Sequence, residues 1–400
     1  MKKEPFLKAK PIIETLETAG YEAFFVGGCV RDLLIDREIK DIDIATSAPP
    51  EAVSQLFDKV IPVGIAHGTV IVRLDGISYE ITTFRSEEGY SDRRRPDHVQ
   101  FIQQIDEDLK RRDFTINALA MTKEGEIIDL FEGKKDLTNR LIRTVGNAYD
   151  RFMEDPLRMI RAVRFSSQLG FAIEDNTLYY MKDLKEEIET IAIERLLNEI
   201  TQFFQGEYIG SSFHYVIDTG IYRHLPVFKN KPNIIHIFPK NLSSFESFSE
   251  IIAMLHYLDN QIPIEEWAKS WKCANKIKRD AINLYESIIQ FKKNGISNWL
   301  VYRLDQNNYK AFIHVTDTLN LSSQISLDEL TAYSNQLPIH TRSEIQFDGH
   351  ELQTMFPNRE KGPWMKEYIS KIEYAIVMNE LENDYKQIKE WILCHPPEVN

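Results

Sequence analysis

The order of apolar and polar positions divides the chain into two parts with different periods. In the first part, apolar residues alternate over short segments bounded by glycine and proline, which predicts β-strands separated by short helices. Beyond about residue 145 they recur every three or four positions, which predicts helices with few strands. The expected elements of the first part are helices over residues 11–20, 29–35 and 48–58 and strands over 22–28, 40–46, 68–76 and 77–85.

Turn residues and longer helical periods complete this organisation. Asp75-Gly76 lies between two alternating segments, which predicts a β-hairpin. The polar segment 86–99 follows and is expected to be a mobile loop. Helices are expected over residues 156–170, 191–205, 248–258, 278–291 and 364–393, so the pattern predicts an α/β head followed by a long helical remainder.

Composition indicates an intracellular protein of several domains. The chain has 400 residues, of which 43% are hydrophobic, enough for two to four cores. Its three cysteines, Cys29, Cys273 and Cys394, are far apart, which argues against a disulfide framework or a zinc site. No apolar run approaches the ~18 residues of a membrane span, and the first ten residues lack the apolar core of a signal peptide. We therefore expect a cytoplasmic protein without a membrane segment.

Charge is distributed unevenly along the chain. The net charge of −13 argues against a broad nucleic-acid surface. Between Arg85 and Arg164, however, 12 of the 21 arginines gather, and basic and acidic residues balance there at 16 each. A locally neutral, arginine-rich region predicts discrete contacts with phosphates or bases. Ordinary surface arginines would give the same count.

The segment KDIDIAT places two aspartates in an expected strand. Alternation puts Asp41 and Asp43 on one face and the two isoleucines on the other. Paired carboxylates repel each other unless a cation lies between them, and oxygen ligands select hard cations such as Mg²⁺. Two metals on such a pair could activate a hydroxyl and hold a triphosphate. By itself the motif is also compatible with a solvated strand.

A double glycine stands just upstream of these aspartates. Gly27 and Gly28 separate an expected strand from an expected helix, where backbone N–H groups can approach phosphate oxygens. Arg31, one turn into the helix, can add a charge-assisted contact. A phosphate cradle followed by paired carboxylates predicts a site for a metal–nucleoside triphosphate, although a double glycine is often only a turn.

Two further segments carry candidate chemistry. In RRDFTINALA, Arg112 could reach the triphosphate or sugar, and Asp113 and Asn117 could fix a ribose or brace the head. In EDPLRMIRAVRF, a helical wheel puts Glu154, Arg158, Arg161 and Phe165 on one face, with Asp155 three residues before Arg158. Pro156 suits the first turn of that helix.

Asp155 and Arg158 could together read a base. A carboxylate accepts hydrogen bonds and a guanidinium donates them. Cytosine and adenine each carry an amine beside a ring-nitrogen acceptor, which complements this edge, whereas uracil and guanine carry the reverse pattern. The pair would accept C and A and reject U and G, because a mismatch leaves buried polar groups unpaired. Arg161 and Arg164 are spaced to extend toward base or phosphates. An ion pair flanked by solvated arginines is the plainer interpretation.

These segments, in this order and spacing, resemble the class II CCA-adding enzymes, which are tRNA nucleotidyltransferases. The resemblance rests on GGCVRDLL, DIDIAT, RRDFTINALA and EDPLRMIRAVRF, and DGHELQTMF and KGPWMKEYISKIEYAIVMNEL look like the C-terminal part of the Gram-positive bacterial members. It implies an α+β protein: a polymerase-β-like nucleotidyltransferase head with a small β-sheet (1–145), then an all-helical neck (146–210), body (211–300) and tail (301–400).

The resemblance also implies an activity and a set of site residues. CTP and ATP would supply C, C and A to the 3′ end of tRNA without a template, and pyrophosphate would leave. Asp41 and Asp43 would hold Mg²⁺, with Glu80 as a candidate third ligand. Nucleotide binding would fall to Gly28, Arg31, Arg112, Asp155, Arg158, Arg161 and Arg164, supported by Gly27, Asp113, Asn117 and Glu154, with Glu154 orienting Arg158.

Close relatives offer alternative functions. CC-adding enzymes lack a functional loop after the hairpin, whereas EEGYSDRRRPDHV is present here. Bacterial poly(A) polymerases tend to carry basic C-terminal extensions, whereas this sequence ends in ILCHPPEVN. A non-catalytic tRNA-binding protein would not need both Asp41 and Asp43. The sequence contains no paired His-Asp motifs of a phosphohydrolase domain, and it leaves the oligomeric state open, with a homodimer as one option.

Overall fold

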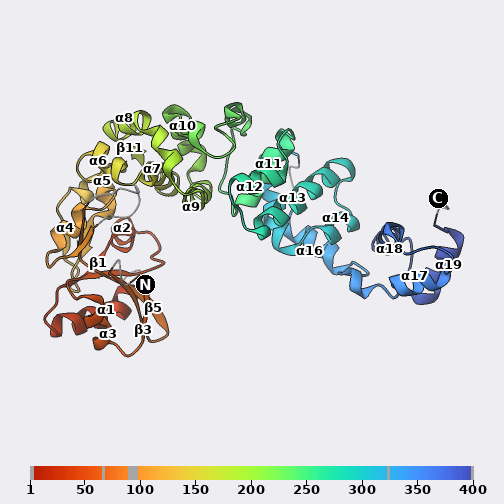
Figure 1. The fold of residues 1–400 in the computed structure, drawn as a ribbon, viewed down its shortest axis with the longest axis horizontal. Coiled ribbons are helices and arrows are strands. Elements are labelled where there is room, and N and C mark those ends of the chain that lie inside the picture. Colours follow the sequence, from red (N-terminus) through yellow and green to blue (C-terminus); the bar gives the residue numbers. More distant parts are fainter. Residues whose placement is uncertain (1–3, 65–67, 89–97, 322–324, 398–400) are drawn as a thin grey trace. The chain divides into compact units, whose positions relative to one another are not determined.

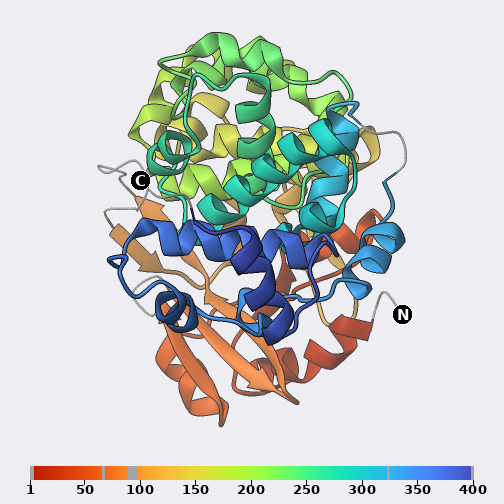
Figure 2. The same cartoon turned by 90° about the vertical axis from the view of Figure 1, so that its right-hand side faces the viewer.

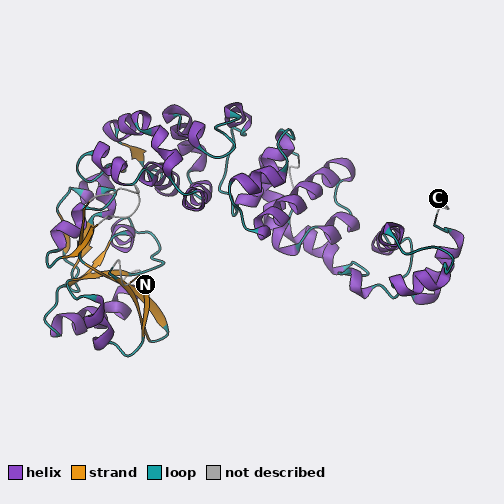
Figure 3. Ribbon diagram, viewed as in Figure 1, coloured by secondary structure: helices purple, strands orange, loops and turns teal. Residues whose placement is uncertain are grey.

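The computed structural model describes residues 4–64, 68–88, 98–321 and 325–397. The chain divides into two compact units, Met1–His236 and Ile237–Asn400 (Figure 1). All strands of the described residues lie in the first unit, and the second is built from helices and loops (Figure 3). None of the helices within the described ranges is long and apolar enough to cross a membrane.

A mixed seven-stranded sheet forms the centre of the N-terminal part of the first unit. Its order is β3-β4-β5-β2-β1-β8-β9, and within it β2 and β5 run parallel while the other neighbours run antiparallel. The strands are β1 (Ala23–Val26), β2 (Asp43–Thr46), β3 (Val60–Gly64), β4 (Thr69–Leu74), β5 (Ile77–Thr83), β8 (Leu119–Met121) and β9 (Ile127–Asp129).

The hairpin predicted at Asp75-Gly76 is present between β4 and β5. Asp75 has φ 49° and Gly76 has φ 80°, so both turn residues adopt the left-handed conformation that a two-residue hairpin requires. Most of the predicted loop 86–99 lies outside the described residues. Its two flanks pair antiparallel as β6 (Arg85–Glu88) and β7 (His98–Phe101).

The strand expected over residues 40–46 begins only at Asp43. Its neighbour β1 ends at Val26, opposite the start of β2, because Gly27 turns the chain out of the sheet. Asp41 therefore lies before the strand and is exposed, while Ile42 is buried. The predicted alternation is correct, but only one of the two aspartates belongs to the sheet.

Short helices pack around this sheet. One buried cluster joins Val26, Ala45 and Ala120 of three strands to Phe84 and to Leu109 of α4. The RRDFTINALA segment forms the 3₁₀ turn η2 (Thr115–Asn117) followed by β8. The helices are α1 (Glu4–Thr18), α2 (Gly28–Leu34), α3 (Pro50–Leu56), α4 (Ile105–Lys110) and α5 (Gly133–Asn139).

A helical layer completes the first unit and lies at one end of the sheet in both views (Figures 1 and 2). Its central helix, α7, packs on α9 and α10 and is buried along most of its length. The elements are α6 (Ala148–Glu154), α7 (Leu157–Leu169), α8 (Asp175–Asp183), α9 (Ile193–Phe204) and α10 (Ile209–Thr219), with a short parallel pair of β10 (Leu141–Ile142) and β11 (Ala172–Ile173).

The second unit corrects one predicted element. The single helix expected over 364–393 is two helices, because Asn379 adopts a left-handed conformation with φ 58° and Asp384 caps the second helix. The fully buried Trp267 and Trp271 lie in the core of this unit. Its helices are α11 (Phe248–Leu258), α12 (Ile264–Ser270), α13 (Asn275–Asn294), α14 (Asn298–Arg303), α15 (Tyr309–Thr318), α16 (Leu327–Asn335), α17 (Gly349–Met355), α18 (Pro363–Val377) and α19 (Tyr385–Cys394).

Candidate active site

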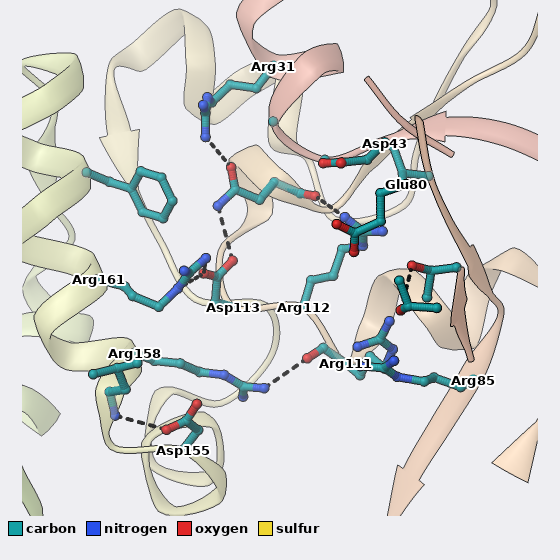
Figure 4. A pocket seen from close by; sticks show the side chains of 18 of the residues that line it. Arg31, Asp43, Glu80, Arg85, Arg111, Arg112, Asp113, Asp155, Arg158 and Arg161 are labelled. Atoms are coloured by element: carbon teal, nitrogen blue, oxygen red, sulfur yellow. Dashed lines mark hydrogen bonds and ion pairs between the residues drawn. The ribbon is translucent and has the colours of Figure 1, made fainter. Parts of the chain in front are cut away.

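A pocket of about 590 Å³ lies in the first unit, where the sheet, the start of α2, the η2 turn and α7 converge (Figure 4). It joins segments that are more than 150 residues apart in the sequence. The lining residues are Val26, Gly27, Gly28, Arg31, Asp43, Ile44, Thr69, Glu80, Thr82, Arg85, Arg111, Arg112, Asp113, Asn117, Asp155, Leu157, Arg158, Arg161, Phe165 and Arg195.

The double glycine forms a tight turn at the edge of this pocket. Gly27 has φ 73° and ψ −128°, a conformation that L side chains avoid, and its N–H donates to the Leu119 carbonyl. A Cβ at this position would lie 2.8 Å from Nη1 of Arg112. The turn therefore requires glycine for its backbone angles and for the close approach of the Arg112 guanidinium.

Asp43 and Glu80 place two carboxylates side by side. They are register partners on the parallel strands β2 and β5, and both line the pocket. Burial and the charge of Glu80 raise the pKa of Asp43 to about 6, with a smaller contribution from Asp41, while Arg112 opposes the shift. The ionised form of Asp43 is thus disfavoured by burial and by Glu80, and Arg112 compensates for it only in part.

This donor set fits a hard divalent cation, because two adjacent carboxylates supply oxygen ligands and mutual repulsion that a cation would relieve. Among the described residues, no group of three or more His, Cys, Asp or Glu side chains lies close enough together to hold a metal ion. Asp41 lines a separate pocket of about 490 Å³ with Lys8 and Tyr79 rather than the larger one. Asp41 thus does not line the pocket that contains Asp43, although its charge acts on Asp43.

The residues predicted to contact the base, Asp155 and Arg158, lie at the junction of α6 and α7. The base-reading role of Asp155 and Arg158 stays a prediction, and the ion pair of the plainer interpretation is not formed between these two side chains. Asp155 instead pairs with Arg195 of α9, and Arg158 donates to Glu154 at 2.6 Å, as the helical wheel suggested. Arg158 also donates to the backbone carbonyls of Arg151 and Arg111 at 3.1 Å each, which connects α7 to the segment after α4.

Asp113 and Asn117 each bond to several protein partners at the wall of the pocket. One oxygen of Asp113 accepts from the Asn117 amide at 3.1 Å and from the Phe114 N–H at 2.8 Å, and the other accepts from Arg161. Asn117 in turn accepts from Nη1 of Arg31 at 2.6 Å. Of the two roles predicted for these residues, these contacts favour bracing the head over fixing a ribose.

Arg161 and Arg164 differ in position. Arg161 lines the pocket, with its guanidinium 5.3 Å from the Phe165 ring centroid. Arg164 lies outside the lining residues, donates to Gln202 at 2.6 Å and pairs with Glu199 at 2.9 Å. Burial and the charge of Arg161 lower the pKa of Arg164 to about 10. Arg164 thus packs α7 against α9, and its predicted contact with a nucleotide is untested.

Sequence reasoning missed several residues that line the pocket. Arg195 is the most informative, because it stands one turn before Glu199 on the otherwise apolar, inward face of α9. Charged residues on a buried helix face need partners of opposite charge, so this pattern could have indicated ion pairs with another segment. The other lining residues without a predicted role are Val26, Ile44, Thr69, Thr82, Arg85, Arg111 and Leu157. Phe165 was placed on the same helix face as Arg158 and Arg161 but was given no role.

Three family models match successive parts of the chain. They are described as "Poly A polymerase head domain" (residues 23–143), "Probable RNA and SrmB- binding site of polymerase A" (170–231) and "tRNA nucleotidyltransferase domain 2 putative" (243–392). The CCA-adding enzyme of Oceanobacillus iheyensis is 49% identical over 401 residues and covers 99% of both chains. This chain belongs to the CCA-adding enzyme family.

Further relatives support the same assignment. A CCA-adding enzyme of Bacillus cereus is 41% identical over 97% of this chain and 98% of its own. The crystal structure of the Bacillus stearothermophilus CCA-adding enzyme in complex with CTP matches with a TM-score of 0.87 at 33% identity, covering 98% of each chain. The predictions of the family, the enzyme class and the α+β fold are confirmed. CCA-adding enzymes generally use a divalent metal.

Proposed function

We propose that this protein adds and repairs the 3′-terminal CCA of tRNA, and that its reaction takes place in the pocket between the sheet and α7. The observation that carries this proposal is the meeting of three features in one cavity: the Gly27 turn, the Asp43–Glu80 carboxylates and the Asp155–Arg158 segment. Solved structures of CCA-adding enzymes that contain CTP, ATP or tRNA support these molecules as substrates.

The reaction that fits this site is nucleotidyl transfer. The 3′ oxygen of the tRNA attacks the α-phosphorus, a new P–O bond forms, the bond to the β-phosphate breaks and pyrophosphate leaves. Arg31 and Arg112 flank the glycine turn and can offset the negative charge of the triphosphate. The guanidinium of Arg112 is held at this place by hydrogen bonds to the Asn117 carbonyl and to Asp108, each 3.2 Å long.

Asp43 and Glu80, with Asp41 from the edge of the sheet, would hold Mg²⁺. When bound, the cation would favour ionisation of the attacking hydroxyl and neutralise charge on the phosphates. Asp155 and Arg158 would select the base. Asp155 accepts from the amine of C or A, and Arg158, held by Glu154, donates to the ring nitrogen.

The remaining predictions complete the proposal. The protein would act in the cytoplasm, and the division into head (1–145), neck (146–210), body (211–300) and tail (301–400) would give the last part the role of binding tRNA. Within this division, the first of the two compact units would comprise the head, the neck and the beginning of the body.

A product assay tests the activity. The purified protein is incubated with tRNA that lacks CCA, Mg²⁺ and each NTP singly, then with all four. Addition of CC from CTP and of a single A after ATP is expected. Termination after CC with all NTPs present would instead indicate a CC-adding enzyme, and long oligo(A) on arbitrary RNA would indicate a poly(A) polymerase. Asp43→Ala is expected to abolish incorporation while tRNA still binds.

A further inference from the structure

The carboxylate of Asp155 is held by a two-point contact from another helix. Nη2 of Arg195 lies 2.7 Å from Oδ2 and Nη1 lies 3.3 Å from Oδ1, so the guanidinium meets both oxygens. Both residues line the pocket, and their side chains are 22% and 16% exposed. A two-point guanidinium contact fixes the plane of a carboxylate as well as its position.

The backbone of α7 occupies a further acceptor position of the same carboxylate. The Leu157 N–H donates to Oδ1 of Asp155 at 3.2 Å. A carboxylate has about four acceptor positions, and three are filled by these contacts. Asp155 is therefore left with about one position with which to accept a hydrogen bond from a ligand.

Arg195 lies on α9, and ion pairs and buried side chains hold this helix against α7. Glu199, one turn later, is 5% exposed and pairs with Arg164 at 2.9 Å and Arg161 at 3.5 Å. Leu196, Ile200 and Phe203 on the same helix are buried, and α9 packs along α7. Helix α9 thus supplies a positive partner to Asp155, which lies between α6 and α7, and a negative partner to two arginines of α7. It can therefore fix the directions in which these side chains point.

We propose that Arg195 is a positioning residue that sets which bases the site accepts, by presenting Asp155 as a hydrogen-bond acceptor in one fixed direction. This inference rests on the proposed function, because it concerns selection of C and A over U and G. With the carboxylate fixed, an amine at the facing position of the base is accepted, whereas a carbonyl meets an acceptor and is rejected. Without Arg195, Asp155 can rotate and this rejection weakens.

The experiment compares nucleotide choice in variants of the full-length protein. Arg195→Ala removes the contact, and Arg195→Lys keeps the charge but loses the two-point geometry. Arg143→Ala is the control, because Arg143 also pairs with a carboxylate, meeting Oδ2 of Asp136 through Nη2 at 2.8 Å and Nε at 2.9 Å, outside the pocket. For each protein, kcat/KM is measured with CTP, UTP, ATP and GTP on tRNA that lacks the whole CCA end or only its terminal A, together with the melting temperature.

We expect Arg195→Ala to lower the preference for CTP over UTP and for ATP over GTP by about 10-fold or more. Arg195→Lys should fall between this variant and the wild type, and it provides the comparison if Arg195→Ala does not fold. Arg143→Ala should keep the wild-type preference even where it lowers stability.

Two results would overturn the inference about Arg195 without affecting the proposed function. Equal loss of kcat/KM for all four nucleotides in both Arg195 variants would mean that Arg195 only supports the fold, and unchanged preferences would mean that Asp155 needs no partner. A wild-type protein that adds neither C nor A would overturn the proposed function, and the inference with it.

Discussion

Arg161 of α7 and Asp113 of the segment after α4 form a buried ion pair, in which Nη2 and Oδ2 are 2.6 Å apart. Asp113 is 8% exposed, and its other oxygen is bonded to Asn117 and the Phe114 N–H. The pair therefore joins the helical layer to the turn that contacts Arg31, so the two sides of the pocket are connected through one carboxylate.

Asp113→Asn is expected to lower the free energy of unfolding by about 3 kcal/mol, because it leaves the Arg161 charge without its main buried partner. Burial alone would raise the pKa of Asp113, but Arg161 and Asn117 outweigh burial and hold this pKa well below its usual range. A carboxylate with a lowered pKa stabilises the fold above its unfolded value and loses that contribution as the pH falls through the folded value.

Urea unfolding at several pH values checks this prediction. The gap between wild type and Asp113→Asn should persist from pH 7 to pH 5 and shrink only below about pH 4. A gap that is already closed at pH 5 would contradict the assigned shift.

Asp43→Asn is expected to have the opposite effect on stability in the absence of metal. The pKa of Asp43 is raised from 3.8 to about 6, so its ionised form destabilises the fold above pH 6 by about 3 kcal/mol, and this cost disappears below about pH 4. The variant should therefore be more stable than wild type at pH 8 in EDTA, with little difference at pH 4. Equal stability at pH 8 would contradict the shift. Asp75→Asn, in the exposed hairpin turn, is the control.

Mg²⁺ is expected to raise the melting temperature of the wild type more than that of Asp43→Asn. A ligand that binds the folded state stabilises it by RT ln(1 + [L]/Kd), and the variant lacks one carboxylate of the proposed site. Thermal unfolding at increasing Mg²⁺ concentrations measures this difference, and NaCl at matched ionic strength controls for screening. The same rise in both proteins would place the cation elsewhere.

Gly27→Ala is expected to weaken binding of all four nucleotides by about 10-fold or more, because its Cβ would displace the Arg112 guanidinium from the triphosphate side of the pocket. The left-handed backbone adds a folding cost of about 1–3 kcal/mol. Gly20→Ala is a matched control, since Gly20 has φ 89° and open space around its Cβ position. Gly20→Ala should lose stability yet bind nucleotides as the wild type does. A raised KM for NTPs in both variants would mean that backbone strain alone, and not displacement of Arg112, weakens nucleotide binding.

The double variant Asp155→Ala with Arg158→Ala is expected to incorporate U and G along with C and A, because both halves of the base-reading edge are removed. Steady-state incorporation of each NTP measures the change, and circular dichroism establishes that the helices remain. Selectivity for C and A that survives both substitutions would exclude this edge as the reader of the base.

Local patterns in the sequence determined much of the site. Gly27 was identifiable because a strand-to-helix turn needs a residue without a side chain, and the 100° helical period placed Glu154 next to Arg158. The Asp75-Gly76 hairpin followed from turn chemistry alone. These features depend on neighbours within a few residues, and that information is written in the local order of side chains.

The tertiary structure decided the contacts between distant segments. It paired Asp155 with Arg195 rather than with Arg158, and it set Glu80 beside Asp43 through the register of two parallel strands. It also left Asp41 before the strand, because β1 ends at Val26 and Gly27 turns the chain out of the sheet. Periodicity states which face a side chain occupies but not which segment packs against that face, so these partners were fixed only when the chain folded.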